Sequence, residues 1–422
     1  MTIGSSESLV HSARHLRAGM KISIAAAASL ILASCLSDDP SGQTNNTDFV
    51  GAVPVTPVQS QPLPGAQPNA QPSGDQIGTG PVHVAMILPL TQGTSPSVVG
   101  TSLRNAADLA LSESGSTDVT IYLKDDHSTP DGARQAAQAA IAEGDEMVLG
   151  PLFSPDVKAV ASVTQPANKT VVAFSTDTSN AEPGVYLLSF LIENYVDRIV
   201  DYAASQGKKS FAALIPDNDY GRVAEAEFQQ YCAHRGLRVM GVEDYTPQTL
   251  KASVQKIAQL GDQIDTLFIP EQANAMPAMA QALTAAGLDS KKVQILGTGL
   301  WNDARVLSLP ALQGAWFAAP DNAGFTAFAA RYRARFKSDP TRIATLGYDA
   351  ASLAVALSHK PAPHYTQDVI TSRAGFNGVD GVFRFLANGR NERALAILQI
   401  NNGTTAQLSA PPRTLASNSS AT

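Results

Sequence analysis

Serine and lysine stand three residues apart at two places in the chain. Ser205 with Lys208 and Ser253 with Lys256 both match S-x-x-K, the nucleophile motif of penicilloyl-serine enzymes. Such enzymes also carry a K-T-G, which this chain lacks, and the G-x-S-x-G of many hydrolases is missing as well. Both serines fall on or at the ends of solvent-facing stretches with helical period. We interpret both matches as chance and expect no enzymatic activity.

Spacing argues equally against metal and phosphate chemistry. The histidines at positions 83, 127, 234, 359 and 364 are scattered, and no pair of them has the separation that a zinc-binding helix needs. The acidic run at residues 125–131 does not match the ligand spacing of a calcium loop. The stretch at residues 207–210, GKKS, lacks the spaced first glycine of a phosphate-binding loop. We therefore expect neither a metal nor a cofactor.

The charge balance argues against nucleic acid as a partner. The 422-residue chain has a formal net charge of −7. Binding to nucleic acid is driven by basic side chains that neutralise phosphates. An acidic chain is also weakly attracted to anionic lipid, so membrane attachment of this chain would have to be covalent.

A secretion signal lies near the start of the chain. Residues 20–35, MKISIAAAASLILASC, combine a basic start with a short apolar run, which is typical of a signal peptide and too short for a membrane-spanning helix of about 20 apolar residues. The ending at Cys35 resembles the lipobox of bacterial lipoproteins, in which cleavage precedes a cysteine that is then acylated. We predict a signal peptide over residues 1–34, with Met20 a more natural start than Met1.

A lipid on Cys35 would hold the protein on a membrane in the periplasm. Leu36 follows the cysteine where Asp would stand in another class, and this resembles lipoproteins of the outer membrane. The alternative is an ordinary signal peptide followed by a chance cysteine. Cys232, the second cysteine, shares helical spacing with Ala224 and Phe228, which predicts a buried thiol in a core.

Two segments contain few apolar side chains that could be buried in a core. Residues 35–81 are rich in proline among Gln, Asn, Ser, Thr and Gly. Such a composition cannot offset the entropy of ordering, so we predict a disordered tether that proline partly extends. Residues 409–422 have a similar composition and are predicted to form a disordered tail.

Residues 82–408 form the predicted folded body. Its length exceeds what one hydrophobic core usually serves, so two lobes are expected. Short apolar runs alternate with amphipathic stretches such as residues 192–203, which is typical of βαβ units and of parallel sheets covered on both faces. The predicted strands are residues 82–88, 119–123, 146–149, 170–174, 211–215, 237–242, 266–269 and 293–296. Thr129 followed by Pro130 predicts a helix start. Residues 381–386 and 394–400, around Asn388 and Gly389, predict an antiparallel hairpin.

The predicted topology selects a set of loops for a binding site. In open parallel sheets, ligands bind outside the carboxyl ends of the strands. These ends are followed by residues 90–94, 151–154, 175–178, 217–220, 271–272 and 298–302. The loops are rich in hydroxyls, include Tyr220 and Trp301, and contain no Lys or Arg. We predict a site for a small neutral or zwitterionic ligand, held by hydroxyls and aromatic walls. For any one of these residues, a cap or turn role is the alternative.

The same segments carry a family resemblance. The stretches VAMILPL at 84–90, VLGPLFS at 148–154 and DYG at 219–221 resemble type 1 periplasmic binding proteins of the leucine-binding-protein group. Within that group, the sequence most resembles lipoproteins known as penicillin-binding-protein activators. This closer resemblance is carried by LPLT at 88–91, GPLFSPDV at 150–157, LGTGLWND at 296–303, GAWFAAPD at 314–321 and FNGVDGVFRFLANGRNERALAIL at 376–398.

The resemblance implies a fold of two doubly wound α/β lobes joined by a hinge of three crossovers. One lobe would contain about residues 82–191 and 321–375, and the other about residues 192–320 and 376–408. In the amino-acid receptors of this group, hydroxyls in the loops that match Ser154, Ser175 and Thr176 hold the ligand carboxylate. An aromatic residue that matches Tyr220 completes the site together with an acidic residue of the second lobe.

The matching loop for that acid, residues 298–303, has no carboxylate at the expected place. Glu271, next to Gln272, is a possible substitute, and Trp301 adds an aromatic wall. The departure argues against binding of a free amino acid. The resemblance therefore implies a non-enzymatic activator of a peptidoglycan synthase, a penicillin-binding protein. The alternative is a receptor that delivers an amino-acid-type solute to an ABC permease, in which ligand closes the lobes by hinge motion.

Overall fold

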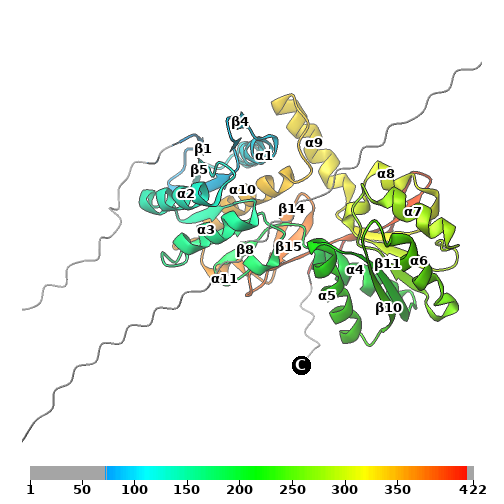
Figure 1. Cartoon of the computed structure of the whole chain (residues 1–422). Helices are drawn as coiled ribbons and strands as arrows, with labels where there is room; N and C mark the ends of the chain where they lie inside the picture. Colours follow the sequence, from blue (N-terminus) through cyan, green and yellow to red (C-terminus); the bar gives the residue numbers. More distant parts are fainter. Residues whose placement is uncertain (1–71, 73, 416–422) are drawn as a thin grey trace, which may run out of the picture. The chain divides into compact units, whose positions relative to one another are not determined.

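The computed structural model describes residues 72 and 74–415 (Figure 1). The predicted signal peptide, the lipid attachment at Cys35 and most of the predicted tether lie outside the described residues. The described part forms two lobes, each a largely parallel sheet covered by helices on both faces. This confirms the predicted α/β class with two doubly wound lobes.

The first lobe is built on a six-stranded sheet with the order β1-β5-β2-β6-β7-β8. All neighbours pair in parallel except β1, which runs antiparallel to β5. The strands are β1 (Gln76–Gly78), β2 (Val82–Leu88), β5 (Val119–Asp125), β6 (Met147–Leu149), β7 (Thr170–Ala173) and β8 (Val185–Leu187). The helices are α1 (Val98–Ser114), α2 (Pro130–Glu143), α3 (Ser154–Thr164), α9 (Asn322–Phe336), α10 (Ala344–Ser358) and α11 (Gln367–Ile370). A small hairpin, β3 (Thr91–Gln92) with β4 (Ser95–Pro96), follows β2.

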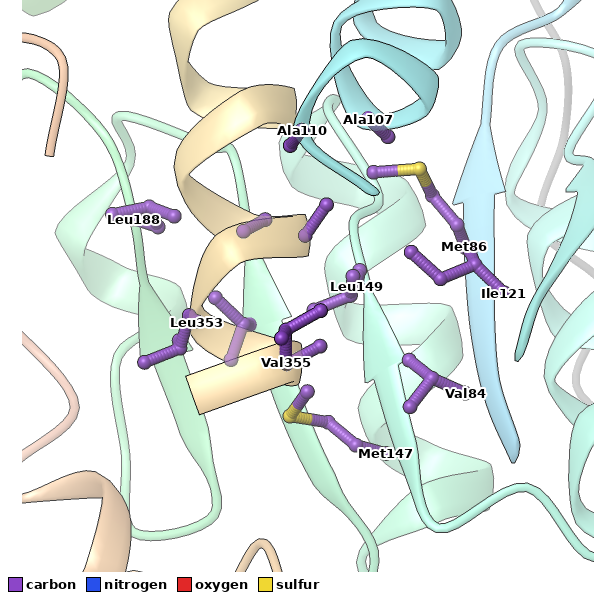
Figure 2. Close-up of a cluster of buried hydrophobic side chains, with 14 of the residues drawn as sticks. Val84, Met86, Ala107, Ala110, Ile121, Met147, Leu149, Leu188, Leu353 and Val355 are labelled. Carbon is purple, nitrogen blue, oxygen red and sulfur yellow. The ribbon is translucent and has the colours of Figure 1, made fainter. Parts of the chain in front are cut away.

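The first-lobe core has two layers, one on each face of the sheet. On β2, Val84, Met86 and Leu88 pack in the layer with α1 and α10, part of which is drawn in Figure 2. Ala85 and Ile87 pack in the other layer, with α2 and α3. Because side chains of a strand alternate between faces, a strand buried on both sides is apolar at nearly every position. This is why β2 is apolar at every position except His83.

The second lobe is built on a seven-stranded sheet with the order β10-β9-β11-β12-β13-β17-β18. Pairing is parallel up to β13 and antiparallel for the last two strands. The strands are β9 (Ser210–Pro216), β10 (Arg238–Tyr245), β11 (Thr266–Phe268), β12 (Gln294–Gly297), β13 (Trp316–Ala319), β17 (Ala396–Asn401) and β18 (Thr404–Ser409). The helices are α4 (Ile192–Ser205), α5 (Asp219–His234), α6 (Leu250–Ala258), α7 (Met276–Ala285) and the short α8 (Ala304–Leu307).

Local sequence signals explain several of these elements. Helix α2 begins at Pro130, as predicted, and the hydroxyl of Thr129 accepts a hydrogen bond from the backbone N–H of Gly132. A cap of this kind stabilises a helix by ~1 kcal/mol. Cys232 is fully buried beside Phe228 and Ala224 in the core between α4, α5 and the sheet, which confirms the predicted core thiol.

The chain passes between the lobes three times, at residues 188–191, 320–321 and 394–395. The third crossover lies later than the sequence suggests. Strands β14 (Phe376–Gly378), β15 (Gly381–Phe385) and β16 (Asn391–Arg393) form a small antiparallel sheet. Phe383 and Phe385 belong to the first-lobe core, where Phe385 packs on Tyr186. The assignment of residues 376–393 to the second lobe is therefore wrong, because their aromatic side chains are buried in the first.

The predicted hairpin is also only partly correct. β15 pairs with β16 across the turn at Asn388 and Gly389, whereas the expected partner strand, β17, pairs with β13 of the second lobe.

The two ends of the folded body also differ from the predicted bounds, residues 82 and 408. β1 extends the first sheet ahead of residue 82, and the carbonyl of Leu415 accepts a hydrogen bond from Arg384 at 3.1 Å. Ordered contacts therefore reach into both segments that composition assigns to tether and tail.

Candidate ligand-binding site

A cavity of about 830 Å³ collects loops that follow strands of both sheets. Thr176 follows β7, Tyr220 follows β9, Gln272 follows β11 and Leu300 follows β12. The first two crossovers contribute Phe190 and Pro320. We call this cavity the cleft. Its position at the carboxyl ends of parallel strands is the place where open α/β sheets bind ligands.

Aromatic side chains form much of the cleft wall: Phe190, Tyr195, Tyr220 and Phe325. The hydroxyl of Tyr220 donates a hydrogen bond to Thr298 at 2.9 Å. Burial raises the pKa of Tyr195 to about 12, so its phenol stays protonated near neutral pH. Burial also raises the pKa of Tyr220, and the bond to Thr298 opposes that rise. Both tyrosines therefore offer the cleft a neutral ring and a neutral hydroxyl.

Two glycines, one at the end of β12 and one just after it, make room for two aromatic rings. A Cβ on Gly299 would lie 2.6 Å from Cε1 of Tyr195, and a Cβ on Gly297 would lie 2.2 Å from the ring of Trp301. Any larger residue would push one ring away from its place. The sequence Gly-Thr-Gly at residues 297–299 thus leaves room for the ring of Tyr195 in the cleft wall and for the ring of Trp301 in the core.

Three charged side chains line the cleft, and each is paired. Arg305 donates to Asp303 through Nε at 2.9 Å and Nη2 at 2.8 Å. These bonds hold the pKa of Asp303 down to about 2. Arg342 donates to both carboxylate oxygens of Asp380, at 2.7 Å and 3.1 Å. The rings of Phe190 and Phe325 lie 5.0 Å and 4.7 Å from the guanidinium carbon of Arg342, within cation–π range.

Several uncharged polar groups in the cleft have no hydrogen-bond partner among the described residues. They are the hydroxyls of Thr176 and Tyr195 and the side-chain amides of Gln272 and Asn274. Asn302 and Asn322 bond to each other, with 2.6 Å between the amide nitrogen of Asn302 and the oxygen of Asn322. The cleft therefore offers a bound molecule neutral donors and acceptors.

Three of the predicted site residues line the cleft: Thr176, Tyr220 and Gln272. Four do not. Ser154 donates to Asp177 at 2.5 Å and accepts from Asn180 at 2.9 Å, and the hydroxyl of Ser175 accepts from the backbone N–H of Asp177. These two serines shape the loop at Asp177, and the bond from Ser154 is the main cause of the lowered pKa of that carboxyl.

Glu271 and Trp301 point away from the cleft. Glu271 is buried and accepts hydrogen bonds from the hydroxyl of Tyr245 at 2.5 Å and the backbone N–H of Gln272 at 2.6 Å. Trp301 is fully buried in the second-lobe core, because a short 3-10 helix (Gly299–Trp301) turns its ring inward. The prediction of Trp301 as a cleft wall is wrong.

Sequence reasoning missed Phe190, Tyr195, Phe325 and Arg342. None of them follows a strand that was predicted. Phe190 lies on the first crossover and Tyr195 just after it. Phe325 lies in α9, which follows the second crossover, and Arg342 lies between α9 and α10. The three crossovers run between the lobes. Aromatic residues on or soon after a crossover were therefore the sequence signal that could have identified Phe190, Tyr195 and Phe325 as cleft residues.

Within residues 72 and 74–415, no three His, Cys, Asp or Glu side chains are grouped in a way that would hold a metal ion. In the same part of the chain, no helix is both long and apolar enough to cross a membrane.

Comparison with known proteins agrees with this architecture. A family model described as periplasmic binding protein matches residues 81–405. A Rhodospirillum rubrum protein assigned to a branched-chain amino acid ABC transporter is 19% identical with a TM-score of 0.67, over 78% of this chain and 99% of that one. No curated protein matches the chain in sequence.

Two further solved structures share the fold. A branched-chain amino acid ABC transporter periplasmic ligand-binding protein from Burkholderia xenovorans LB400 is 16% identical with a TM-score of 0.63, over 79% of this chain and 96% of that one. An ABC transporter substrate-binding protein from Desulfitobacterium hafniense, in complex with Leu, is 18% identical with a TM-score of 0.57, over 78% and 99%. The solved structures share the type 1, leucine-binding-protein-like fold of two doubly wound lobes, and the family match over most of the chain shows that this chain belongs to the periplasmic binding protein family.

Proposed function

We propose that the protein is a periplasmic solute receptor that binds a small molecule in the cleft and presents it to the permease of an ABC importer. One observation carries this proposal. Aromatic rings and unpartnered neutral polar groups from both lobes converge on one cavity of about 830 Å³, a size that suits a small solute. The solved relatives, which are ABC transporter proteins at low sequence identity, support the same reading.

Thermal-shift screening of the purified full chain tests the proposal. The panel contains amino acids, aromatic acids, aromatic amides, sugars and muropeptides. A ligand that binds only the folded state stabilises it by ~2.7 kcal/mol at a concentration of 100 Kd, so it raises Tm. We expect at least one compound to raise Tm in the wild type and to lose its effect in Tyr220→Ala.

The matched control is Tyr231→Ala, which removes a partly buried tyrosine from the same helix α5 at a position outside the cleft. Its ligand-dependent shift should equal that of the wild type. A panel in which no compound shifts Tm, or in which Tyr220→Ala keeps the full shift, would contradict a receptor role for the cleft.

The second candidate is the activator of a peptidoglycan synthase that the sequence resembles. The observation in its favour is that Ser154 and Ser175, the hydroxyls expected to hold a ligand carboxylate, are bonded to Asp177 and Asn180 and lie outside the cleft. Binding of the purified chain to a penicillin-binding protein, with a faster rate of glycan polymerisation, would favour this candidate. No effect on that rate at saturating protein would remove it.

The lipid anchor belongs to the proposal under either candidate. Acylation of Cys35 would keep the receptor or activator at the membrane, and Leu36 favours the outer membrane. Mass spectrometry of the amino-terminal peptide should find it to begin at a diacylglyceryl-modified Cys35. A peptide that continues through an unmodified Cys35 would contradict the anchor.

A further inference from the structure

We propose that the cleft selects an uncharged ligand with a flat apolar face and hydrogen-bonding groups along its edge, and that Asp380 sets this selectivity by masking the charge of Arg342. The inference rests on the proposed receptor function, because it names the class of solute that the same cleft takes. It departs from recognition of amino acids or other carboxylates.

The first argument is the pairing of charge. Arg342 is the cationic side chain that reaches the cleft from its first-lobe side, and its side chain is 39% exposed. Asp380 accepts two hydrogen bonds from it and has a fully buried side chain, so water screens this pair little. Arg305 is likewise paired with Asp303. No charged group among the cleft residues is left for a ligand ion.

The second argument is the surroundings of the Arg342 guanidinium. Two rings, Phe190 and Phe325, lie within 5.0 Å of its central carbon. A second arginine, Arg393, lies 4.8 Å from the ring of Phe190, with a side chain that is 1% exposed. Rings and carboxylate together fix the guanidinium in place. A ligand carboxylate would have to compete with Asp380 for a bidentate partner that is already aligned.

The third argument concerns zwitterions. An amino acid needs a carboxylate for its ammonium group and donors for its carboxylate. Glu271 is buried and bonded to Tyr245, so it does not serve the ammonium. The free groups of the cleft are instead the hydroxyls of Thr176 and Tyr195 and the amides of Gln272 and Asn274. These groups suit carbonyl, amide and hydroxyl edges, and the aromatic wall suits a flat apolar face.

The test uses two probes of nearly equal shape that differ in charge, 4-fluorobenzamide and 4-fluorobenzoate, with the full chain at pH 7.5. Fluorine NMR of the probe measures Kd even for weak binding. For the wild type, we expect the amide to bind at least tenfold more tightly than the carboxylate. In Asp380→Asn the charge of Arg342 is unmasked, so affinity for 4-fluorobenzoate should rise at least tenfold while that for the amide changes less than threefold.

Two controls test whether the gained affinity for 4-fluorobenzoate comes from Arg342. Asp108→Asn unmasks Arg335, which lies outside the cleft and has a side chain that is 41% exposed, close to that of Arg342; it should change both affinities less than threefold. In Asp380→Asn with Arg342→Met, the gained affinity for 4-fluorobenzoate should disappear. Circular dichroism verifies that each variant is folded, and the wild-type ratio tests the proposal without any variant.

A wild type that binds 4-fluorobenzoate as well as the amide, or that fails to bind the amide, would overturn the inference. So would an Asp380→Asn chain that folds without gaining affinity for the carboxylate. Receptor function would survive these results if another compound in the thermal-shift panel bound in a manner dependent on Tyr220, so failure of the inference is distinct from failure of the proposed function.

Discussion

Asp145 allows a quantitative test of how a buried carboxyl group makes the stability of this fold depend on pH. Its side chain is 1% exposed, and neither carboxylate oxygen has a hydrogen-bond partner among the described residues. Burial is the main cause that raises its pKa to about 7 from an ordinary value of 3.8, against the opposing charge of Lys124. The difference corresponds to ~4 kcal/mol for ionising the carboxyl in the folded protein, as an upper bound.

The sign of the pH effect follows from the two protonation states. Between pH 4 and pH 7 the unfolded chain has an ionised Asp145, whereas the folded protein keeps the proton. The folded state then binds more protons, so the free energy of unfolding falls as pH rises, by ~1.4 kcal/mol per pH unit from this residue. In Asp145→Asn the side chain stays neutral and that part of the slope is lost.

Urea denaturation followed by circular dichroism at pH 4.5, 6.0 and 7.5 measures this slope. We expect Asp145→Asn to be within ~1 kcal/mol of the wild type at pH 4.5 and more stable by ~1–4 kcal/mol at pH 7.5. Asp303→Asn is the control, because a carboxyl with a pKa of about 2 is ionised in both states throughout this range. Equal slopes for the wild type and Asp145→Asn, or a less stable variant at pH 7.5, would refute the reasoning.

Three further outcomes test the description of the site and core. Gly299→Ala should cost ~1–3 kcal/mol by forcing the Tyr195 ring to move, and the cost should shrink when Tyr195→Ala is added, as a double-mutant cycle would show. Trp301→Ala should cost ~3–5 kcal/mol in urea denaturation, as expected for a core ring, and a variant that loses ligand but no stability would contradict this placement. In a Cys35→Ser chain, Cys232 should resist iodoacetamide at pH 8 until the protein unfolds, because burial excludes the reagent and raises the pKa of the thiol to about 12.

Strands buried on both faces were the part of the fold that sequence predicts best. β2 was predicted with its observed bounds, because a strand covered by helices on both sides is apolar at nearly every position. β8 and β13, with three and four residues, were missed, although β6 and β11, with three residues each, were predicted, so length alone does not explain the difference. β17 was assigned to the wrong partner, because a turn at Asn388 and Gly389 does not tell which strand the chain reaches next.

The candidate site was predictable in its loops but less so in its side chains. Thr176, Tyr220 and Gln272 reach the cleft because the loops after parallel strands meet there. Trp301 occupies such a loop too, yet the space beside Gly297 lets its ring turn inward. The direction of a side chain in a loop depends on neighbours that a single sequence does not reveal. Arg342 reaches the cleft from a segment that follows no predicted strand.

The order in which the chain visits its lobes has a consequence for how the molecule assembles. α1 packs against α10, which the chain supplies only after it has passed through nearly all of the second lobe. The second sheet in turn needs β17, which follows the third crossover. Neither lobe is complete until about residue 400 is available, so a partly synthesised or carboxy-terminally clipped chain exposes apolar surface on both lobes at once. Assembly must therefore rely on pairings between distant segments, which makes it slow and favours proteolysis of truncated chains.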